Sequence, residues 1–454
     1  MISTLKEFFS GKSVAGGQRS KKIRTNTFFL FLIKGGGMVV NLLYVPILFN
    51  SLNKENYGIW LTITSIVSWV YYFDFGLGHG LRNRYAEARA REDDGEAGKL
   101  VSNAYFFISI ILGSLFLILL PVIFFINWNS VLNTTLIENS ELRLLVLIVL
   151  SSFTLKIVLE VVTIMIKADQ KPAAAELYLF ISSFLSLVAV CILVLLDAVN
   201  LLTAALAVVL SPVIILVIFN FRYFSSEYAG FRPNVKDIDR TYFSKIFSLG
   251  SKFFVIQVAM LVLFSSSNLL IIQMLNPSEV AVYNISLKYY QIPTIFFSIV
   301  VTPYWSAITE AYTRKELDWI KMSINKLLKL AFIVIGGVLF MAVVADPVYR
   351  IWINKDFEMD PMLNALMALY TAFTILGTVF THFIMGVGKL KVGLLVVIVK
   401  MIVFIPFAVF LLQQVGSSGL VIALILVNSI PSLILESIQY RKIIQGSAKG
   451  IWQA

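Results

Sequence analysis

The chain has 454 residues, of which 58% are hydrophobic and only 14% are charged, and its mean hydropathy is +0.85. One soluble core cannot bury that much apolar surface, so the composition excludes a soluble globular protein and indicates an integral membrane protein. Apolar runs of about 20 residues, the length that crosses a bilayer core of about 30 Å as a helix, recur along the chain, which excludes a β-barrel.

The apolar runs predict an all-α membrane protein with twelve transmembrane helices. In chain order the predicted spans are about 26–50, 57–78, 102–126, 142–166, 175–196, 199–220, 246–275, 280–306, 330–346, 361–386, 392–414 and 418–440. We therefore expect a tail (1–25), a first six-helix lobe (26–224), a linker (225–245), a second six-helix lobe (246–440) and a second tail (441–454). The first run is too long for a signal peptide, so the N-terminal segment is expected to be retained.

Lys and Arg residues alternate between the two sides of this layout. The tails and every second connection together hold 28 of them, whereas the opposite connections hold only Lys54, Arg350 and Lys355. Cytoplasmic loops carry the excess of positive charge in membrane proteins. Both termini are therefore predicted to be cytoplasmic, and the net charge of +11 needs no nucleic-acid partner.

The two halves of the chain share a short pattern. The segment LFNSLNKENYGIW (48–60) lies between the first two predicted helices, and IIQMLNPSEVAVY (271–283) lies between the seventh and the eighth. A duplication of six helices would relate the halves by an axis along the membrane normal, with a substrate site between the lobes near mid-depth. A chance match between two turns of this kind is an equally good explanation.

Charged side chains within the predicted spans are costly there and are functional candidates by default. Five of them are lysines: Lys34, Lys156, Lys252, Lys288 and Lys400. A lysine can instead extend its stem so that the ammonium group reaches the headgroups, which is the structural alternative for each. An interior with more lysine than acid suits an anion, and lysine binds phosphate as a point charge. We therefore expect a cavity that binds a phosphate-bearing substrate.

Two acids accompany these lysines. Glu160 is four residues after Lys156 on the same helical face, so the two charges either neutralise each other or respond to a proton, a sodium ion and the substrate. Asp74 lies in FDFGLGHG (73–80), near the inner end of the second span. We expect the glycines there to form a bendable helix end, the following residues 82–99 to be an exposed charged hairpin, and Asp74 to pair with Arg82 or Arg84.

The sequence contains few residues that could form the catalytic or metal sites of several enzyme classes. The chain has one cysteine and two histidines, so multi-cysteine metal sites are excluded and a histidine-based zinc site or catalytic triad is disfavoured. The glycines of 73–80 follow an apolar helix rather than a strand, so they do not form a nucleotide-binding loop. The predicted outer connections are short, which disfavours a membrane glycosyltransferase or polymerase. We expect a transporter without catalytic residues, metal or other cofactor.

The segments LYVPILFNSLNKENYGIW (43–60) and WVYYFDFGLGHGLRNRYAEA (69–88) resemble the Wzx-type polysaccharide flippases of the multidrug/oligosaccharidyl-lipid/polysaccharide (MOP) exporter superfamily. The resemblance implies a 6+6, MATE-like bundle around a cationic cavity. It further implies a flippase for undecaprenyl-pyrophosphate-linked oligosaccharide in the bacterial inner membrane, serving O-antigen or another surface polysaccharide. Coupling to a proton or sodium gradient is proposed for several relatives.

This family has no strict catalytic signature. The resemblance assigns Asp74, Gly76, Gly78 and Arg82 to the inner end of helix two, where we place a gate, and Glu160 joins them as a coupling candidate on its charge alone. The expected partners are the lipid-linked oligosaccharide, a polysaccharide polymerase and a chain-length regulator, and we expect a functional monomer. A MATE-like drug and ion antiporter is the second hypothesis, although the basic interior disfavours cationic drugs.

Overall fold

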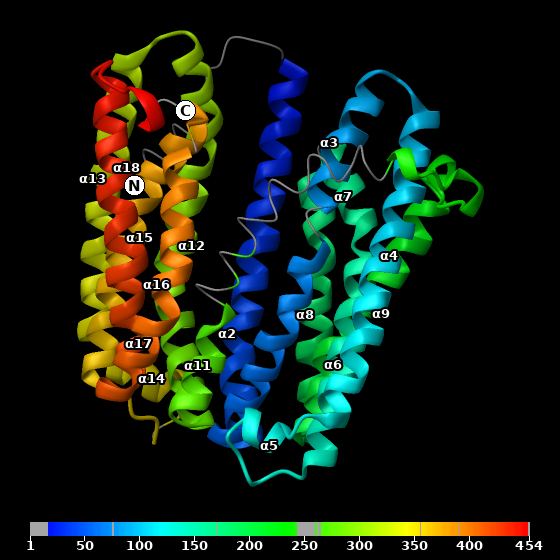
Figure 1. The fold of residues 1–454 in the computed structure, drawn as a ribbon, viewed down its shortest axis with the longest axis vertical. Coiled ribbons are helices and arrows are strands. Elements are labelled where there is room, and N and C mark those ends of the chain that lie inside the picture. The colour runs from blue at the N-terminus through cyan, green and yellow to red at the C-terminus, as the bar shows by residue number, and fades with distance from the viewer. Residues whose placement is uncertain are drawn as a thin grey trace. The chain divides into compact units, whose positions relative to one another are not determined.

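A computed structural model of the chain describes residues 17–74, 77–169, 171–242, 265–354, 356–389 and 391–452, together with 258 and 261. Within these ranges the chain forms helices joined by turns, and no strand is present, as predicted (Figure 1). Nine helices in the described ranges are long and apolar enough to cross a membrane. The first of them, Leu32–Tyr71, covers most of the first two predicted spans, 26–50 and 57–78. The protein is therefore a multi-pass, all-α membrane protein.

The turn between those first two spans forms where the sequence places it. Helix α2 (Gly17–Ser68) contains one non-helical residue, Asn53, with φ of 64° and ψ of 168°. This combination of φ and ψ lies outside the left-handed region that Asn tolerates and is costly for any residue other than glycine, so the surrounding turn holds Asn53 in a strained backbone conformation. Its Oδ1 accepts a hydrogen bond from the backbone N–H of Asn56 at 3.0 Å, which caps the helix that follows.

The chain divides by its contacts into two compact units. Unit 1 comprises Met1–Ile47, Phe73–Phe124 and Leu147–Phe254. Its helices after α2 are α3 (Leu77–Ala90), α4 (Asp94–Phe125), α6 (Asn139–Leu159), α7 (Val161–Ala168), α8 (Pro172–Leu195) and α9 (Leu201–Phe224), followed by the short turns η2 (Ala229–Phe231) and η3 (Val235–Asp237). Helix α8 packs along α9, and α3 packs against α7 (Figure 1).

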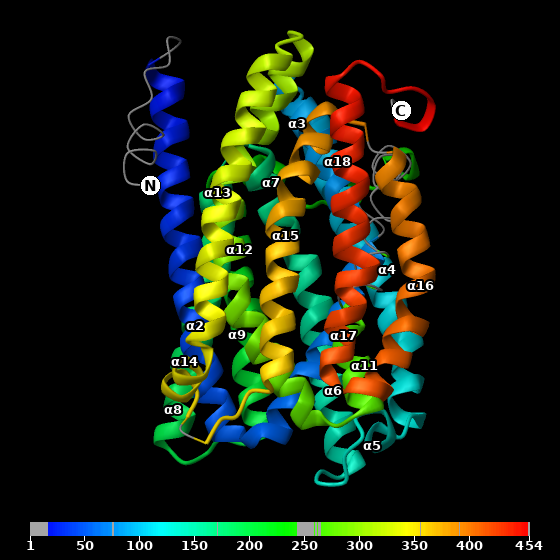
Figure 2. The ribbon, with the colours of Figure 1, turned by 90° about the vertical axis from the view of Figure 1, so that its left-hand side faces the viewer.

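Unit 2 comprises Leu48–Tyr72, Phe125–Val146 and Val255–Ala454. Its elements, after the end of α2, are η1 (Trp69–Asp74), α5 (Trp128–Val131), α11 (Ser267–Met274), α12 (Pro277–Thr313), α13 (Leu317–Val343), α14 (Ala345–Trp352), α15 (Pro361–Val387), α16 (Lys391–Val415), α17 (Ser417–Ala423), the π-helical turn η5 (Leu424–Ser429), α18 (Ile430–Ile444) and η6 (Gly450–Trp452). Helix α15 packs against α12, α13 and α18 (Figure 2). The predicted lobes 26–224 and 246–440 stay a prediction.

Two predictions about connections are wrong. Residues 82–99 are not an exposed hairpin, because α3 extends to Ala90 and α4 begins at Asp94. Leu81, Tyr85 and Ala88 lie at helical spacing and are buried, so this charged segment has an apolar face that packs. Helices α12 and α13 similarly extend through most of the charged residues 307–329. Hydropathy identifies only the part of a helix that crosses the membrane. The helix itself can continue beyond that part, because its backbone hydrogen bonds also form in water.

Candidate functional site

Lys156 and Glu160 form the predicted charged pair in unit 1. Lys156 Nζ lies 3.7 Å from Glu160 Oε1, and the two side chains are 17% and 14% exposed. Tyr178, on the neighbouring helix α8, donates a hydrogen bond to the same carboxylate oxygen. The acid is thus held between a cation of its own helix and a phenol of the next helix. A buried pair of this kind is favourable only while both partners are present.

Glu160 also marks a break in the fourth predicted span. Helix α6 ends at Leu159 and α7 begins at Val161, but both belong to one apolar span, Asn139–Ala168, which confirms the predicted span 142–166 and adds a one-residue interruption at Glu160. The carbonyl of Leu159 accepts a hydrogen bond from Asn220 Nδ2 at 2.9 Å, and Tyr105 donates to Asn220 Oδ1 at 2.5 Å. A carbonyl without a partner is expensive at membrane depth. Side chains of α9 and α4 therefore stabilise a break that hydropathy alone could not reveal.

Lys400 in α16 is buried, with 4% of its surface exposed, in the middle of unit 2. Its Nζ donates to the carbonyl of Asn428 at 2.9 Å, to Asn428 Oδ1 at 3.1 Å, and to Ser432 Oγ. Asn428 belongs to the π-helical turn η5, and π-helical turns inside α-helices occur frequently at functional sites. An ammonium group has three donors, and three acceptors surround this one.

Glu436 in α18 is a membrane-level acid that the sequence reasoning missed. Thr381 of α15 donates a hydrogen bond to Glu436 Oε2 at 2.7 Å, and the carboxyl group interacts electrostatically with Lys400. The signal was present in the sequence, since Glu436 lies inside the predicted span 418–440. The structure thus brings a lysine and an acid together in each unit, Lys156 with Glu160 and Lys400 with Glu436.

Among the described residues, the hydrogen bonds and ion pairs of these two clusters do not include Lys34 or Lys288. Lys34 in α2 is exposed. Gly36, two residues later, has no side chain, and a Cβ added there would lie 2.9 Å from the ring of Phe180. Gly36 therefore lets the ring of α8 approach the helix that carries Lys34. Lys288 in α12 is half-buried, and Lys252 lies outside the described residues.

The predicted gate residues lie around the start of α3. Asp74 is the last residue of η1, Gly76 lies outside the described residues, and Gly78 is the second residue of α3, in its first turn. Arg82 is exposed on α3. Arg84 pairs with Glu87 one turn further along, with 2.9 Å between Arg84 Nη1 and Glu87 Oε2.

A polar cluster holds the end of α3 to the ends of α7 and α9. Arg89 Nε lies 3.8 Å from Asp169 Oδ1, and the Arg89 guanidinium lies 5.0 Å from the ring centroid of Phe231. Tyr228 donates to Asp169 Oδ2 at 2.8 Å, and burial followed by this hydrogen bond raises the pKa of the Tyr228 phenol. Tyr228 therefore stays a neutral donor, and the cluster fixes the connections of unit 1.

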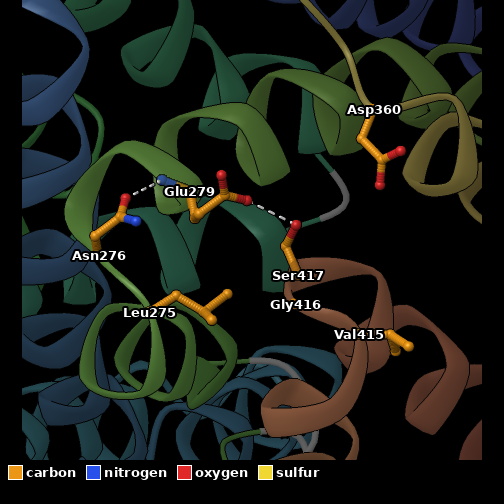
Figure 3. A pocket seen from close by; sticks show the side chains of 7 residues that line it. All are labelled: Leu275, Asn276, Glu279, Asp360, Val415, Gly416 and Ser417. Atoms are coloured by element: carbon orange, nitrogen blue, oxygen red, sulfur yellow. Dashed lines mark hydrogen bonds between the residues drawn. The ribbon is translucent and has the colours of Figure 1, made fainter.

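A pocket of about 350 Å³ opens in unit 2 between the α11–α12 turn, the start of α15 and the α16–α17 turn (Figure 3). Ser417 donates to Glu279 Oε2 at 2.8 Å, and Asp360 caps α15 by accepting from the N–H of Met362 at 3.0 Å. Its charged lining groups are both acids, Glu279 and Asp360. A diphosphate would be repelled there, so this pocket does not suit the predicted anion.

Comparison with known protein families and sequences supports the resemblance. A family model described as "Polysaccharide biosynthesis protein" matches residues 23–309. The putative O-antigen transporter of Salmonella typhi is 23% identical to this chain over an alignment of 375 residues, which covers 79% of this chain and 82% of that protein.

Several solved transporter structures share the fold. A multidrug resistance MATE family transporter of the MOP superfamily in its inward-facing conformation matches with a TM-score of 0.71 at 17% identity, covering 90% of this chain and 98% of that one. An outward-facing conformation of a MATE family transporter of the same superfamily gives 0.64 at 18%, covering 94% and 96%. A MOP superfamily transporter from Pyrococcus furiosus, described by the reverse polarity of its binding pocket, gives 0.62 at 15%, covering 93% and 95%.

Proposed function

We propose that this chain, which belongs to the polysaccharide biosynthesis protein family, moves a lipid-linked oligosaccharide across the bacterial inner membrane. The observation that carries this proposal is the set of lysines on membrane-level helices of the described residues, Lys34, Lys156, Lys288 and Lys400, of which two lie beside an acid, Lys156 beside Glu160 and Lys400 beside Glu436. Lysines at this depth suit a substrate with a phosphate headgroup, and undecaprenyl pyrophosphate carries such a group next to the glycan. The relative from Salmonella typhi, called a putative O-antigen transporter, supports the glycan class.

The transport step that we propose is alternating access without covalent chemistry. Twelve helices in two six-helix lobes, with both termini in the cytoplasm, take up the glycan headgroup from the cytoplasmic leaflet and release it on the periplasmic side, while the lipid tail stays in the bilayer. The protein works as a monomer and hands its substrate to a polymerase and a chain-length regulator. Neither a metal nor another cofactor takes part.

Lys34 is the proposed first contact for the diphosphate. It is exposed on α2, whereas the ammonium group of Lys400 is surrounded by its three acceptors. An exposed ammonium group can exchange water for phosphate oxygens without first breaking protein hydrogen bonds. Lys156 and Lys400 can bind the diphosphate only after they separate from their present partners.

Coupling to a proton or sodium gradient is proposed to act through Glu160. This carboxylate contacts both a lysine and a phenol, so a substrate phosphate that draws Lys156 away leaves Glu160 ready to take up a cation. Glu436 beside Lys400 is the equivalent candidate in unit 2.

The test is complementation of a strain that lacks this gene and therefore its surface polysaccharide. Lys34→Ala should abolish surface polysaccharide while the protein still reaches the membrane, and Lys34→Arg, which keeps the charge, should retain part of it. Wild-type polysaccharide from Lys34→Ala would refute the assignment of Lys34. A wild-type chain that failed to restore polysaccharide, but exported cationic dyes against a proton gradient, would favour the MATE-like antiporter instead.

A further inference from the structure

The two turns that share a sequence pattern also share their capping geometry. Turn A is defined as residues 48–60 and turn B as residues 271–283, and both belong to unit 2. In turn A, Asn53 Oδ1 accepts from the N–H of Asn56 at 3.0 Å; in turn B, Asn276 Oδ1 accepts from the N–H of Glu279 at 3.0 Å. An Asn that caps the next helix is common by itself. The correspondence extends further, because a carboxamide residue precedes each capping Asn by three positions.

In turn A that carboxamide is Asn50, and it binds the connection between α14 and α15. Asn50 Nδ2 donates to the carbonyl of Ile353 at 2.8 Å, and Asn354 Nδ2 donates back to Asn50 Oδ1 at 2.7 Å. Beneath this exchange the ring of Phe49 packs edge to face against Phe357, with centroids 5.7 Å apart. Turn A, from the first half of the sequence, is thus attached to a connection of the second half.

In turn B the corresponding carboxamide is Gln273, and it binds the connection around α5. Gln273 Nε2 donates to the carbonyls of Ser130, at 2.9 Å, and Val131. Asn133, in the same connection, donates back to the carbonyls of Ile272 at 3.1 Å and Leu275 at 2.9 Å. Turn B, from the second half, is attached to a connection of the first half. The two attachments are the same arrangement with the halves exchanged.

The turns also touch each other directly. A Cβ added to Gly58 of turn A would lie 1.8 Å from the carbonyl oxygen of Pro277 in turn B, so only glycine permits this backbone contact. Thr134, in the connection around α5, donates a hydrogen bond to Glu55 of turn A at 3.1 Å, so this connection contacts both turns. The short helices α5 and α14 lie at the same end of unit 2, the lower end in both views (Figures 1 and 2).

We propose that Asn50, Asn354, Gln273 and Asn133 form an outer clamp that must open whenever the transporter opens to the outside. The charge pattern of the sequence predicts that Asn133 and Asn354 lie in outer connections and that Asn50 and Gln273 lie at the outer ends of the spans 26–50 and 246–275, and the inference rests on the proposed transport function. Each half supplies one turn and one connection, so neither attachment can release fully while the other holds. The clamp side chains Asn50, Gln273 and Asn133 are exposed, so water can replace their hydrogen bonds at little cost when the clamp opens.

Cysteine pairs across the clamp test this proposal in the full chain with Cys191→Ser. One pair combines Asn50→Cys with Asn354→Cys, whose side chains are in hydrogen-bond contact, and the other combines Gln273→Cys with Asn133→Cys, whose side chains each bind the backbone near the other residue. A thiol-reversible cross-linker of disulfide length joins each pair. The matched control combines Asp346→Cys with Arg350→Cys, one turn apart on α14 and 3.1 Å apart as an ion pair. Its cross-link lies within a single helix and leaves the clamp free.

Amide hydrogen exchange of the purified protein is the first measurement, because it needs no substrate. Cross-linking either clamp pair should slow exchange at least tenfold in both turns, including the turn that carries no cross-link, and the control pair should leave both unchanged. Exchange that slows only in the cross-linked turn, or pairs that do not cross-link, overturns the clamp. The exchange result tests the clamp even if the proposed substrate is wrong.

New surface polysaccharide in complemented cells is the second measurement. Either clamp cross-link should reduce it to the level of the strain without the gene, and reduction of the cross-link should restore it. Cross-linked protein that still supports wild-type polysaccharide overturns the clamp. Failure of the reduced variants and of the wild-type chain to restore polysaccharide rejects the proposed function, while the exchange result still decides the clamp.

Discussion

Glu160→Leu should destabilise the protein, because it removes the carboxylate that pairs with the Lys156 ammonium among apolar helices. The pair is 3.7 Å apart and both side chains are less than one fifth exposed. Residues in such contact show coupling free energies of about 0.5–3 kcal/mol in double-mutant cycles. Insertion of an unpaired lysine at a helix centre costs about 2.5–3.5 kcal/mol. We therefore expect Glu160→Leu alone to lower the free energy of unfolding by about 2–3 kcal/mol.

The double variant separates pairing from any intrinsic need for the acid. Lys156→Leu combined with Glu160→Leu removes both charges, and an apolar replacement of a buried pair is often neutral or stabilising. We expect the double variant to recover most of the lost stability, measured as the midpoint of thermal unfolding in detergent. Transport, measured by surface polysaccharide, should stay absent because the proposed coupling group is gone.

Two results would contradict this reasoning. Additive effects of the two substitutions on the unfolding midpoint would mean that the charges do not interact in the folded protein. Full polysaccharide from the stable double variant would mean that the pair is structural and that coupling lies elsewhere. Tyr178→Phe is the matched control, because it removes one hydrogen bond to Glu160 and leaves both charges in place.

Three further substitutions test other parts of the structure. Asn220→Leu should lower the free energy of unfolding by about 1–3 kcal/mol, since the buried carbonyl of Leu159 loses its donor; an unchanged denaturation midpoint would contradict the stabilised helix break. Gly58→Ala should lower the free energy of unfolding by about 1–3 kcal/mol, because the added methyl group overpacks against Pro277. The control Gly113→Ala, where a Cβ would meet nothing within 4 Å, should be neutral or stabilising by up to about 1 kcal/mol. Equal effects of the two substitutions would refute the turn contact. Lys400→Met should destabilise the protein, and adding Glu436→Gln should restore part of the loss, as thermal unfolding in detergent would report; no recovery would mean that the two charges are independent.

The family could be predicted from a short part of the sequence. The resemblance to the Wzx-type flippases rested on residues 43–88, and it is confirmed by a family model that covers 23–309. The all-helical membrane class was predicted from apolar runs alone and is confirmed. These features are readable because the bilayer requires long apolar helices wherever a chain crosses it, whatever the tertiary structure.

The interruptions of the helices were not predicted. The break at Glu160 depends on Asn220, which is 60 residues further along the chain, and the π-helical turn of Asn428 receives the ammonium group of Lys400. Neither partner can be identified by spacing, because each lies on a different helix. The same reason explains why Glu436 was missed as the companion of Lys400, although its position within a predicted span was a usable signal.

By itself the sequence determined that the chain crosses the membrane as helices, where the turn between its first two spans lies, and that Lys156 and Glu160 share a face. These features depend on apolar length, turn residues and helical period. Only the tertiary structure decided that α3 packs as a helix and which acceptors surround Lys400. It also decided that the two similar turns, 223 residues apart in the sequence, meet at Gly58 and Pro277. Those features depend on contacts between distant segments, which local patterns do not encode.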